Sequence, residues 1–259
     1  AGQVLEEGIT EAGAFSSWLA LATSYSSNDL AMLPFYIYYS MFGFQRVGDS
    51  AWQAGDMRAR GFMLGATAGR TTLNGEGLQH EDGQSQVQAS FIPNVRSYDP
   101  TFAYEVVTIV QRGMQRMMAE QQDEYWYLTL MNENYTHPDM PEGSAEGIIK
   151  GMYLLKDAGR GKKGELRVQL MGSGTILREV IAAADLLDAD FGIKADIWSC
   201  PSFNELARDG VDAERWNRLH PEAKAPRKPW VTQQLEGRSG PAIAATDYVL
   251  HFANQVREY

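Results

Sequence analysis

The sequence predicts an α/β protein built of mostly parallel sheets flanked by helices and divided into two domains. Short runs of apolar, β-branched and aromatic residues alternate along the chain with longer segments whose apolar residues recur every three or four positions. Such alternation of strands and helices is typical of parallel sheets that are covered on both faces. A stretch rich in Asn, Pro, Glu and Gly separates two alternating halves, which indicates two domains.

The elements of the first half follow from this alternation in chain order. The segment 11–24 is alanine-rich with helical spacing, and the aromatic run 32–39 suits a buried strand. Pro100 is expected in the first turn of a later helix, where its fixed φ is well tolerated. The expected elements are a helix at 11–24, a strand at 32–39, a helix at 42–60, a strand at 61–67, a loop at 69–88, a strand at 95–98, a helix that begins at 99–101 and a strand at 125–131.

The second half follows a segment that cannot hold regular structure. Residues 132–147 include Pro138 and Pro141, so we expect the boundary there, with domains at 1–140 and 141–259. The elements expected beyond it are a strand at 166–171, a tight turn at 172–174, a helix with an apolar stripe at Ile176, Val180, Ala184 and Leu187, and a strand at 195–199. Together they predict one βαβ unit.

Charge and composition argue against several classes of function. The formal net charge of -10 disfavours binding to nucleic acid or to an anionic membrane, and the densest cationic run, 160–163, is expected to be a surface turn. The sequence has neither a membrane-spanning apolar run nor a signal-peptide pattern, so we expect a protein that does not span a membrane and is not secreted. Cys200 is the only cysteine, which suits a reducing, cytoplasmic compartment. The missing initial Met suggests a piece of a longer protein.

Two short patterns resemble binding motifs that the sequence does not complete. Residues 172–174 precede a helix, but Leu177 stands where a dinucleotide fingerprint needs its third glycine, so we expect a plain turn. The four histidines lack the spacing of metal ligands, so we expect no metal site from them in this chain: they are His80, His137, His220 and His251.

The stretch 75–83 places one histidine among three glycines and three carboxylates. Glycine permits the unusual backbone angles and close approach that a ligand loop needs, while Glu76 and His80 are residue types that move protons near neutral pH. A solvated acidic turn is the alternative interpretation. The stretch alone does not decide between them.

A carboxylate and an aromatic run lie near two predicted element ends. Glu11 begins the first predicted helix, where its carboxylate either reaches into a crevice at the sheet edge or caps the helix. Five aromatic residues lie between Tyr36 and Arg46, too many for all of them to face inward. A carboxylate, an aromatic wall and a loop with Glu and His together suit an aminopyrimidine ring.

Four stretches at consistent spacing, 8–11, 36–46, 59–83 and 202–210, carry a resemblance to a known family. The sequence resembles the homodimeric bacterial pyruvate dehydrogenase E1 component, a thiamine diphosphate-dependent family of the transketolase-like type, over essentially the whole chain. The resemblance implies that 1–140 is part of the pyrimidine-binding domain and that 141–259 is most of the C-terminal domain. The upstream diphosphate-binding domain and the extreme C-terminus are expected to lie outside the given sequence.

The resemblance also implies how the cofactor ring is held. Glu11 matches the glutamate that hydrogen-bonds N1′ of the aminopyrimidine and favours the imino tautomer, which removes the thiazolium C2 proton. Tyr39 and Phe42 match the aromatic residues against this ring, and Ile9 and Arg46 match neighbouring cofactor-binding positions.

On the substrate side, Glu76 and His80 match a catalytic acid and a histidine that serve proton transfer and handling of the lipoyl group. The implied reaction is decarboxylation of pyruvate followed by reductive acetylation of the lipoyl group of the partner E2, dihydrolipoyl acetyltransferase. Magnesium ligands are expected in the upstream domain. Within this chain, Gly48-Asp49 followed by Asn74 only mimics the magnesium motif, because Ser50 replaces its third glycine.

One departure from the family pattern follows the loop. The family commonly continues Glu-Asp-Gly-His-Ser-His, whereas this chain has Gln84-Ser85-Gln86 and lacks both imidazoles. Glutamine forms hydrogen bonds but carries no proton, so we expect a changed rate or a changed 2-oxo acid if either position assists catalysis. The alternatives are an E1 for another 2-oxo acid such as 2-oxobutanoate, a transketolase-like enzyme, or a non-catalytic fragment with only dimerisation and E2-binding surfaces.

Overall fold

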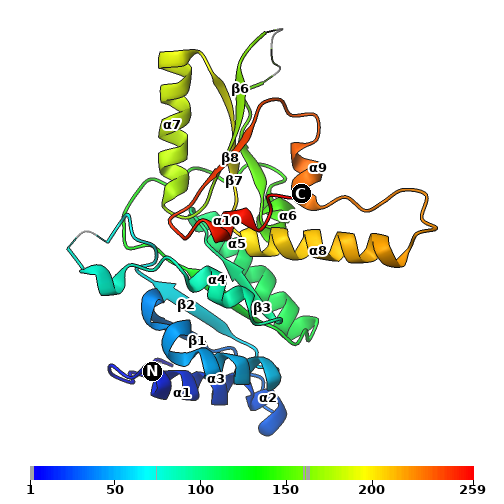
Figure 1. Cartoon of the computed structure of the whole chain (residues 1–259). Coiled ribbons are helices and arrows are strands. Elements are labelled where there is room, and N and C mark those ends of the chain that lie inside the picture. The colour runs from blue at the N-terminus through cyan, green and yellow to red at the C-terminus, as the bar shows by residue number, and fades with distance from the viewer. Residues whose placement is uncertain (1–2, 74, 160, 162–163) are drawn as a thin grey trace.

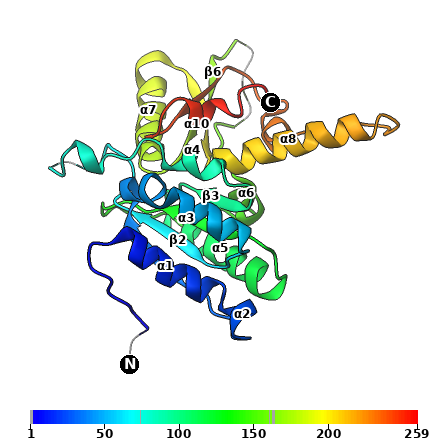
Figure 2. The same ribbon diagram turned by 60° about the horizontal axis from the view of Figure 1, so that its bottom comes forward.

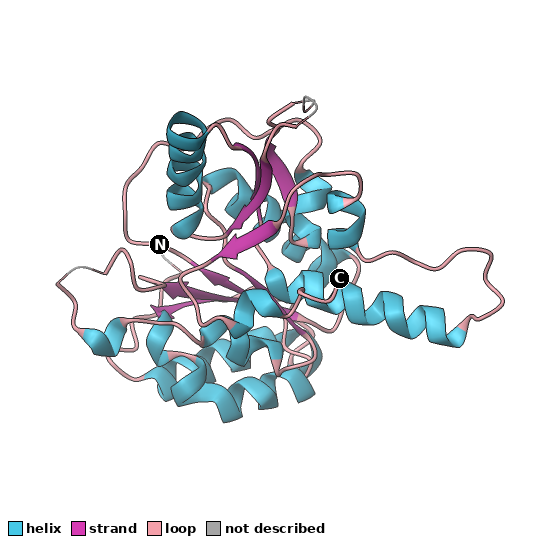
Figure 3. Ribbon diagram, turned by 45° about the horizontal axis from the view of Figure 1, so that its top comes forward, coloured by secondary structure: helices cyan, strands magenta, loops and turns pink. Residues whose placement is uncertain are grey.

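Two mostly parallel β-sheets with helices on both faces organise the computed structural model, which describes residues 3–73, 75–159, 161 and 164–259 (Figure 1). The predicted fold class is confirmed. Figure 3 shows the two sheets in different parts of the molecule, each with its own helices. In the described residues, no helix combines the length and apolar character that crossing a bilayer requires.

The first sheet has the order β1-β2-β4-β3, and all its pairings are parallel. Its described elements are α1 (Glu11–Ala22), α2 (Ser24–Ser27), β1 (Phe35–Tyr39), η1 (Ser40–Phe42), α3 (Phe44–Asp56), β2 (Phe62–Ala66), η2 (Leu78–His80), α4 (Ser85–Ser90), β3 (Val95–Tyr98), α5 (Ala103–Met114), the π-helical η3 (Gln115–Ala119) and β4 (Tyr125–Thr129). Residues of α1, α3 and α4 pack on one face of the sheet, and residues of α5, η3 and α6 (Ala145–Lys150) pack on the other.

The second sheet has the order β5-β7-β6-β8 and is parallel except for β5, which runs antiparallel to β7. Its elements are β5 (Tyr153–Lys156), β6 (Arg167–Gly172), α7 (Ile176–Phe191), β7 (Lys194–Ser199), α8 (Phe203–Leu219), α9 (Trp230–Leu235), β8 (Ala242–Ala245) and α10 (His251–Asn254). Helix α7 packs on one face, as the predicted βαβ unit requires, while α8 extends away from the sheets (Figure 1). Cys200 is buried on the opposite face, where burial raises the pKa of its thiol.

Local chemistry explains where the first elements begin. The Thr10 hydroxyl accepts a hydrogen bond from the Gly13 N–H at 3.3 Å and so caps α1. Strand β1 alternates, with Tyr36 and Tyr38 buried and Tyr39 exposed, which is the pattern of a half-covered strand. The expectation that not all five aromatic residues face inward is confirmed.

Some expectations were wrong. The loop expected at 69–88 contains η2 and the short helix α4, which begins where the Asp82 carboxylate accepts the N–H groups of Gln84 and Ser85. Helix α6 begins at Ala145, inside the segment expected to lack regular structure. Strand β5 was not predicted, because a short edge strand carries little periodic signal. Of the cationic run 160–163, only Gly161 lies within the described residues.

The carboxyl ends of strands from both sheets meet at a junction between the two halves. Asp99 directly follows β3, is buried, and accepts hydrogen bonds from the Thr129 hydroxyl and from the Ser173 hydroxyl, both at 2.7 Å. Ser173 follows β6 in the second sheet. A Cβ at Gly174, where φ is +51°, would lie 2.6 Å from an Asp99 oxygen, so the close approach requires glycine. We retain 140/141 as the proposed domain boundary.

The buried Asp99 gives the junction a pH dependence. Burial raises the pKa of Asp99 from 3.8 to about 7, so between these values the folded chain holds a proton that the unfolded chain has lost. The free energy of unfolding therefore falls as the pH rises through this window, by about 1.4 kcal/mol per pH unit, and the stabilisation is lost above the folded pKa. Asp99→Asn stays neutral and is expected to flatten this slope in denaturant unfolding of the chain. An unchanged slope would exclude Asp99 as its source.

Candidate functional site

Six of the seven residues predicted to form the site make one continuous set of contacts in the first half. They come from the start of α1, the end of β1, η1, α3 and the loop that follows β2. We call this set the Glu11–His80 cluster, and it consists of Glu11, Tyr39, Phe42, Arg46, Glu76 and His80.

The carboxylate of the cluster is held by an arginine. Glu11 is the first residue of α1, and its Oε1 accepts a hydrogen bond from Arg46 at 2.7 Å. Its side chain is only 20% exposed, and its backbone carbonyl accepts a 3.4 Å hydrogen bond from the Tyr36 hydroxyl. A charge-assisted pair of this length fixes the direction of the carboxylate. The Glu11 carboxylate is therefore a hydrogen-bond acceptor whose orientation is fixed by Arg46.

The same arginine joins the carboxylate to the aromatic residues. The Arg46 guanidinium lies over the Phe42 ring, 4.2 Å from its centroid, in a cation–π contact. Phe42 ends η1, and the Phe42 and Tyr39 rings meet edge to face at 6.3 Å between centroids. Tyr39 is 52% exposed, so its ring is available to a ligand.

His80 closes the cluster from the loop side. Its ring lies 5.1 Å from Tyr39 and 5.0 Å from Phe42 between centroids, edge to face in both cases. Its Nδ1 lies 3.7 Å from a carboxylate oxygen of Glu76, which is longer than a hydrogen bond, and has no hydrogen-bond partner among the described residues. A small shift would complete this bond, fix the tautomer and leave Nε2 to exchange a proton.

Two predicted features lie apart from the cluster. Ile9 precedes α1, and its side chain is 98% exposed. Gln86 is fully buried and donates to the Tyr98 carbonyl at 2.9 Å and to the Thr129 hydroxyl at 3.1 Å, so it belongs to the junction around Asp99. Of the two glutamines, only the exposed Gln84 stays at the loop surface, with its Oε1 accepting from the Gly83 N–H.

The residues of the magnesium-like pattern do not form a metal site in the part of the chain that the structure describes. Asp49 lies within α3, as expected from its helical pattern, and Asn74 lies outside the described residues. Among the residues that the structure describes, no group of three or more His, Cys, Asp or Glu side chains is placed to hold a metal ion.

Sequence reasoning missed Asp247, which contacts the base of the loop that carries Glu76 and His80. It lies just beyond β8, in the second half of the chain, and its carboxylate accepts from Arg70 and Thr71. An acid that follows a short apolar run was the available signal, because ligand sites of α/β proteins gather at the carboxyl ends of strands.

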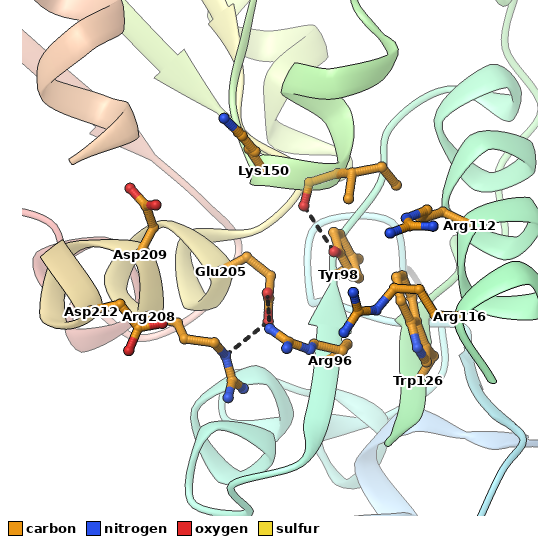
Figure 4. A pocket seen from close by; sticks show the side chains of 11 residues that line it. Arg96, Tyr98, Arg112, Arg116, Trp126, Lys150, Glu205, Arg208, Asp209 and Asp212 are labelled. Atoms are coloured by element: carbon orange, nitrogen blue, oxygen red, sulfur yellow. Dashed lines mark hydrogen bonds and ion pairs between the residues drawn. The ribbon is translucent and has the colours of Figure 1, made fainter. Parts of the chain in front are cut away.

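A separate cavity of about 220 Å³ shares no residue with the cluster (Figure 4). Its arginines are already paired: Arg96 binds Glu124 at 3.0 Å and Glu205 at 2.6 Å, and Arg116 binds Glu124 at 2.5 Å. Acidic side chains therefore compensate these positive charges. The cavity is lined by a network of ion pairs that joins α8 to the first sheet. Its cationic lining consists of Arg96, Arg112, Arg116, Lys150 and Arg208.

The sequence matches two family models in succession. Residues 1–138 match the pyruvate dehydrogenase E1 component middle domain, and residues 151–259 match the transketolase-like TK C-terminal domain. Among curated relatives, the pyruvate dehydrogenase E1 component of Pseudomonas aeruginosa is 63% identical over 100% of this chain and 29% of its own length. That of Escherichia coli K12 is 58% identical over 100% of this chain and 28% of its own. The chain thus spans less than a third of the length of these relatives.

Solved structures resemble the fold at low identity. Transketolase from Campylobacter jejuni superposes with a TM-score of 0.66 at 18% identity, covering 93% of this chain and 32% of that one. Transketolase from Leishmania mexicana superposes with a TM-score of 0.57 at 16% identity, covering 84% of this chain and 28% of that one. At these identities the likeness concerns the fold alone.

Proposed function

Because 138 of its 259 residues match the middle-domain model, this chain belongs to the pyruvate dehydrogenase E1 component family, and we propose that it forms part of a pyruvate-decarboxylating enzyme. In this proposal the enzyme decarboxylates pyruvate and reductively acetylates the lipoyl group of E2, dihydrolipoyl acetyltransferase. It acts as a cytoplasmic homodimer with thiamine diphosphate and Mg²⁺.

The observation that carries the proposal is the Glu11–His80 cluster. A held carboxylate and two aromatic rings suit one edge and one face of a flat aminopyrimidine, and the His80 ring lies against both aromatic rings. Among the described residues no group of three or more His, Cys, Asp or Glu side chains could hold a metal ion. In this proposal, as the family resemblance implies, the diphosphate and its magnesium are held by the upstream domain. When bound, thiamine diphosphate supplies the electron sink that decarboxylation of a 2-oxo acid requires.

Within this site Glu11 holds a proton at the ring nitrogen N1′. The Arg46 guanidinium donates to Oε1 of Glu11 and fixes the carboxylate, and the proposal assigns the short charge-assisted bond with N1′ to the second oxygen. Tyr39 and Phe42 support the ring face, and Ile9, although exposed in this chain, is retained as a neighbouring position. The cluster therefore orients the ring and controls its protonation.

On the other side of the cluster, His80 moves protons to and from the substrate-derived oxygen. Its contacts with Tyr39 and Phe42 support a position beside the proposed ring, and the Glu76 carboxylate, 3.7 Å from Nδ1, is the group that would orient the imidazole. A histidine oriented by a carboxylate exchanges protons efficiently near neutral pH.

An E1 for a different 2-oxo acid, such as 2-oxobutanoate, is the second candidate, because Gln84 replaces a histidine that the family commonly has at the loop surface. Gln86 gives this alternative less support, since it is fully buried and its side-chain nitrogen donates to Tyr98 and Thr129 within the junction.

The test is a panel of 2-oxo acids, including pyruvate and 2-oxobutanoate, assayed with the full-length enzyme and a lipoyl domain as acceptor. We expect the highest kcat/KM with pyruvate and no transfer to a lipoyl domain that lacks its lipoyl group. A higher kcat/KM with 2-oxobutanoate would establish the second candidate. No acyl transfer from any 2-oxo acid would overturn the proposal.

A further inference from the structure

The loop between β2 and α4 carries Glu76 and His80, and both of its ends are fixed by one segment of the second half. At the first end, the Asp247 carboxylate accepts from the N–H groups of Arg70 at 2.7 Å and of Thr71 at 2.8 Å. It also accepts from the Thr71 hydroxyl at 2.7 Å. Three hydrogen bonds on one carboxylate determine the local course of the backbone.

The other end of the loop is tied to the same segment. The Val249 N–H donates to the Gly83 carbonyl at 2.9 Å, and the Asp82 N–H donates to the Gly69 carbonyl at 3.0 Å, which closes the loop at its base. Figure 2 shows the loop emerging from between the two halves. The loop therefore has a base set by the second half and a far side that contacts the aromatic residues of the first half.

The backbone at the base is shaped for this carboxylate. Gly69 has φ of +79°, and a Cβ there would lie 2.5 Å from an oxygen of Asp247. Glycine is thus needed both for the backbone angle and for the close approach. Asp247 is only 8% exposed, and its own carbonyl accepts from Arg70 Nε at 2.8 Å, so the contact is part of a packed arrangement.

We infer that Asp247 is a positioning residue for the active site: it holds the loop so that His80 meets Tyr39 and Phe42. This inference rests on the proposed function. A residue of the C-terminal half thereby affects the chemistry of the pyrimidine-binding half. Asp247 itself is not a member of the Glu11–His80 cluster. A displacement of about 1 Å at a reacting group lowers rates by roughly 10²-fold.

The experiment compares Asp247→Ala and Thr71→Val in the full-length enzyme, with Asp190→Asn on the exposed side of α7 as the matched control. Asp247→Ala is expected to lower kcat with pyruvate and a lipoyl domain by roughly 10²-fold and to change KM much less. Thr71→Val removes one of the hydrogen bonds and should lower kcat to a smaller extent. In the cofactor-free enzyme, amides at 69–73 and 75–84 should exchange faster in Asp247→Ala than in the control.

A double-mutant cycle separates positioning from general destabilisation. If Asp247 acts through His80, Asp247→Ala should lower kcat little further in a His80→Ala background. A full, independent loss in that background would overturn the inference, as would wild-type kcat in Asp247→Ala or unchanged amide exchange in the loop. Should Asp247→Ala fail to fold, Thr71→Val supplies the same cycle. Wild-type enzyme inactive on every 2-oxo acid would refute the proposed function, whereas amide exchange would still test the hold on the loop.

Discussion

Replacement of Glu11 by glutamine is expected to lower kcat of the full-length enzyme for pyruvate by roughly 10²- to 10⁴-fold, the range for loss of a positioned proton-transfer group. Glutamine keeps the size of the side chain and leaves the Thr10 cap of α1 intact, but it cannot hold the negative charge that Arg46 and the ring nitrogen share. The measurement is steady-state acetyl transfer to a lipoyl domain. Glu6→Gln, an equal change at an exposed position before α1, should retain wild-type kcat.

His80→Ala distinguishes the two sides of the cluster. It should impair acetyl transfer while thiamine diphosphate still binds in calorimetric titration, because His80 serves the substrate side and Glu11 the cofactor ring. Wild-type activity in Glu11→Gln would contradict the role of Glu11. Unchanged overall activity in His80→Ala would remove His80 from the mechanism.

Glu124→Ala is expected to cost about 3–5 kcal/mol of unfolding free energy, the cost of removing one partner from a buried ion network. Glu124 is 4% exposed and accepts from Arg96 at 3.0 Å, from Arg116 at 2.5 Å and from the Trp126 indole at 3.1 Å. Burial opposes its charge, yet the hydrogen bond from Arg116 and the charge of Arg96 hold the pKa of this carboxyl below its usual value. Without the Glu124 carboxylate, the guanidinium groups of Arg96 and Arg116 would each lose a negatively charged hydrogen-bond partner.

Denaturant unfolding of the chain measures this cost, and Glu120→Ala is the control. Glu120 pairs with Arg112 at 2.5 Å, but about a third of each side chain is exposed, so its loss should cost less than about 1 kcal/mol. Equal losses of unfolding free energy in Glu124→Ala and Glu120→Ala would contradict the prediction that the buried ion pairs contribute more than the exposed one.

The sequence predicted the parts of the fold and site that depend on local patterns. Apolar spacing indicated β1 to β4 and the βαβ unit, and residue chemistry together with the family resemblance pointed to Glu11 and His80. Helix α4 was missed because its short polar sequence has no clear helical period, and its start depends on the Asp82 side chain. Asp247 was missed because the Arg70 and Thr71 groups that it binds are 177 and 176 residues away along the chain. Contacts at such separations are a property of the assembled sheets.

The meeting of strand ends at Asp99 constrains how this protein changes during evolution. In most α/β proteins the loops at the carboxyl ends of strands vary freely, because the scaffold beneath them carries the stability. Here the same region also joins the halves, because the Asn204 side-chain amide donates to the Gln86 carbonyl at 2.7 Å and the Ser173 hydroxyl donates to Asp99 at 2.7 Å. A substitution that adapts this region to a new substrate must therefore also preserve the contacts between the two halves. Exchanges at such positions should consequently appear in correlated pairs, one from each half of the chain.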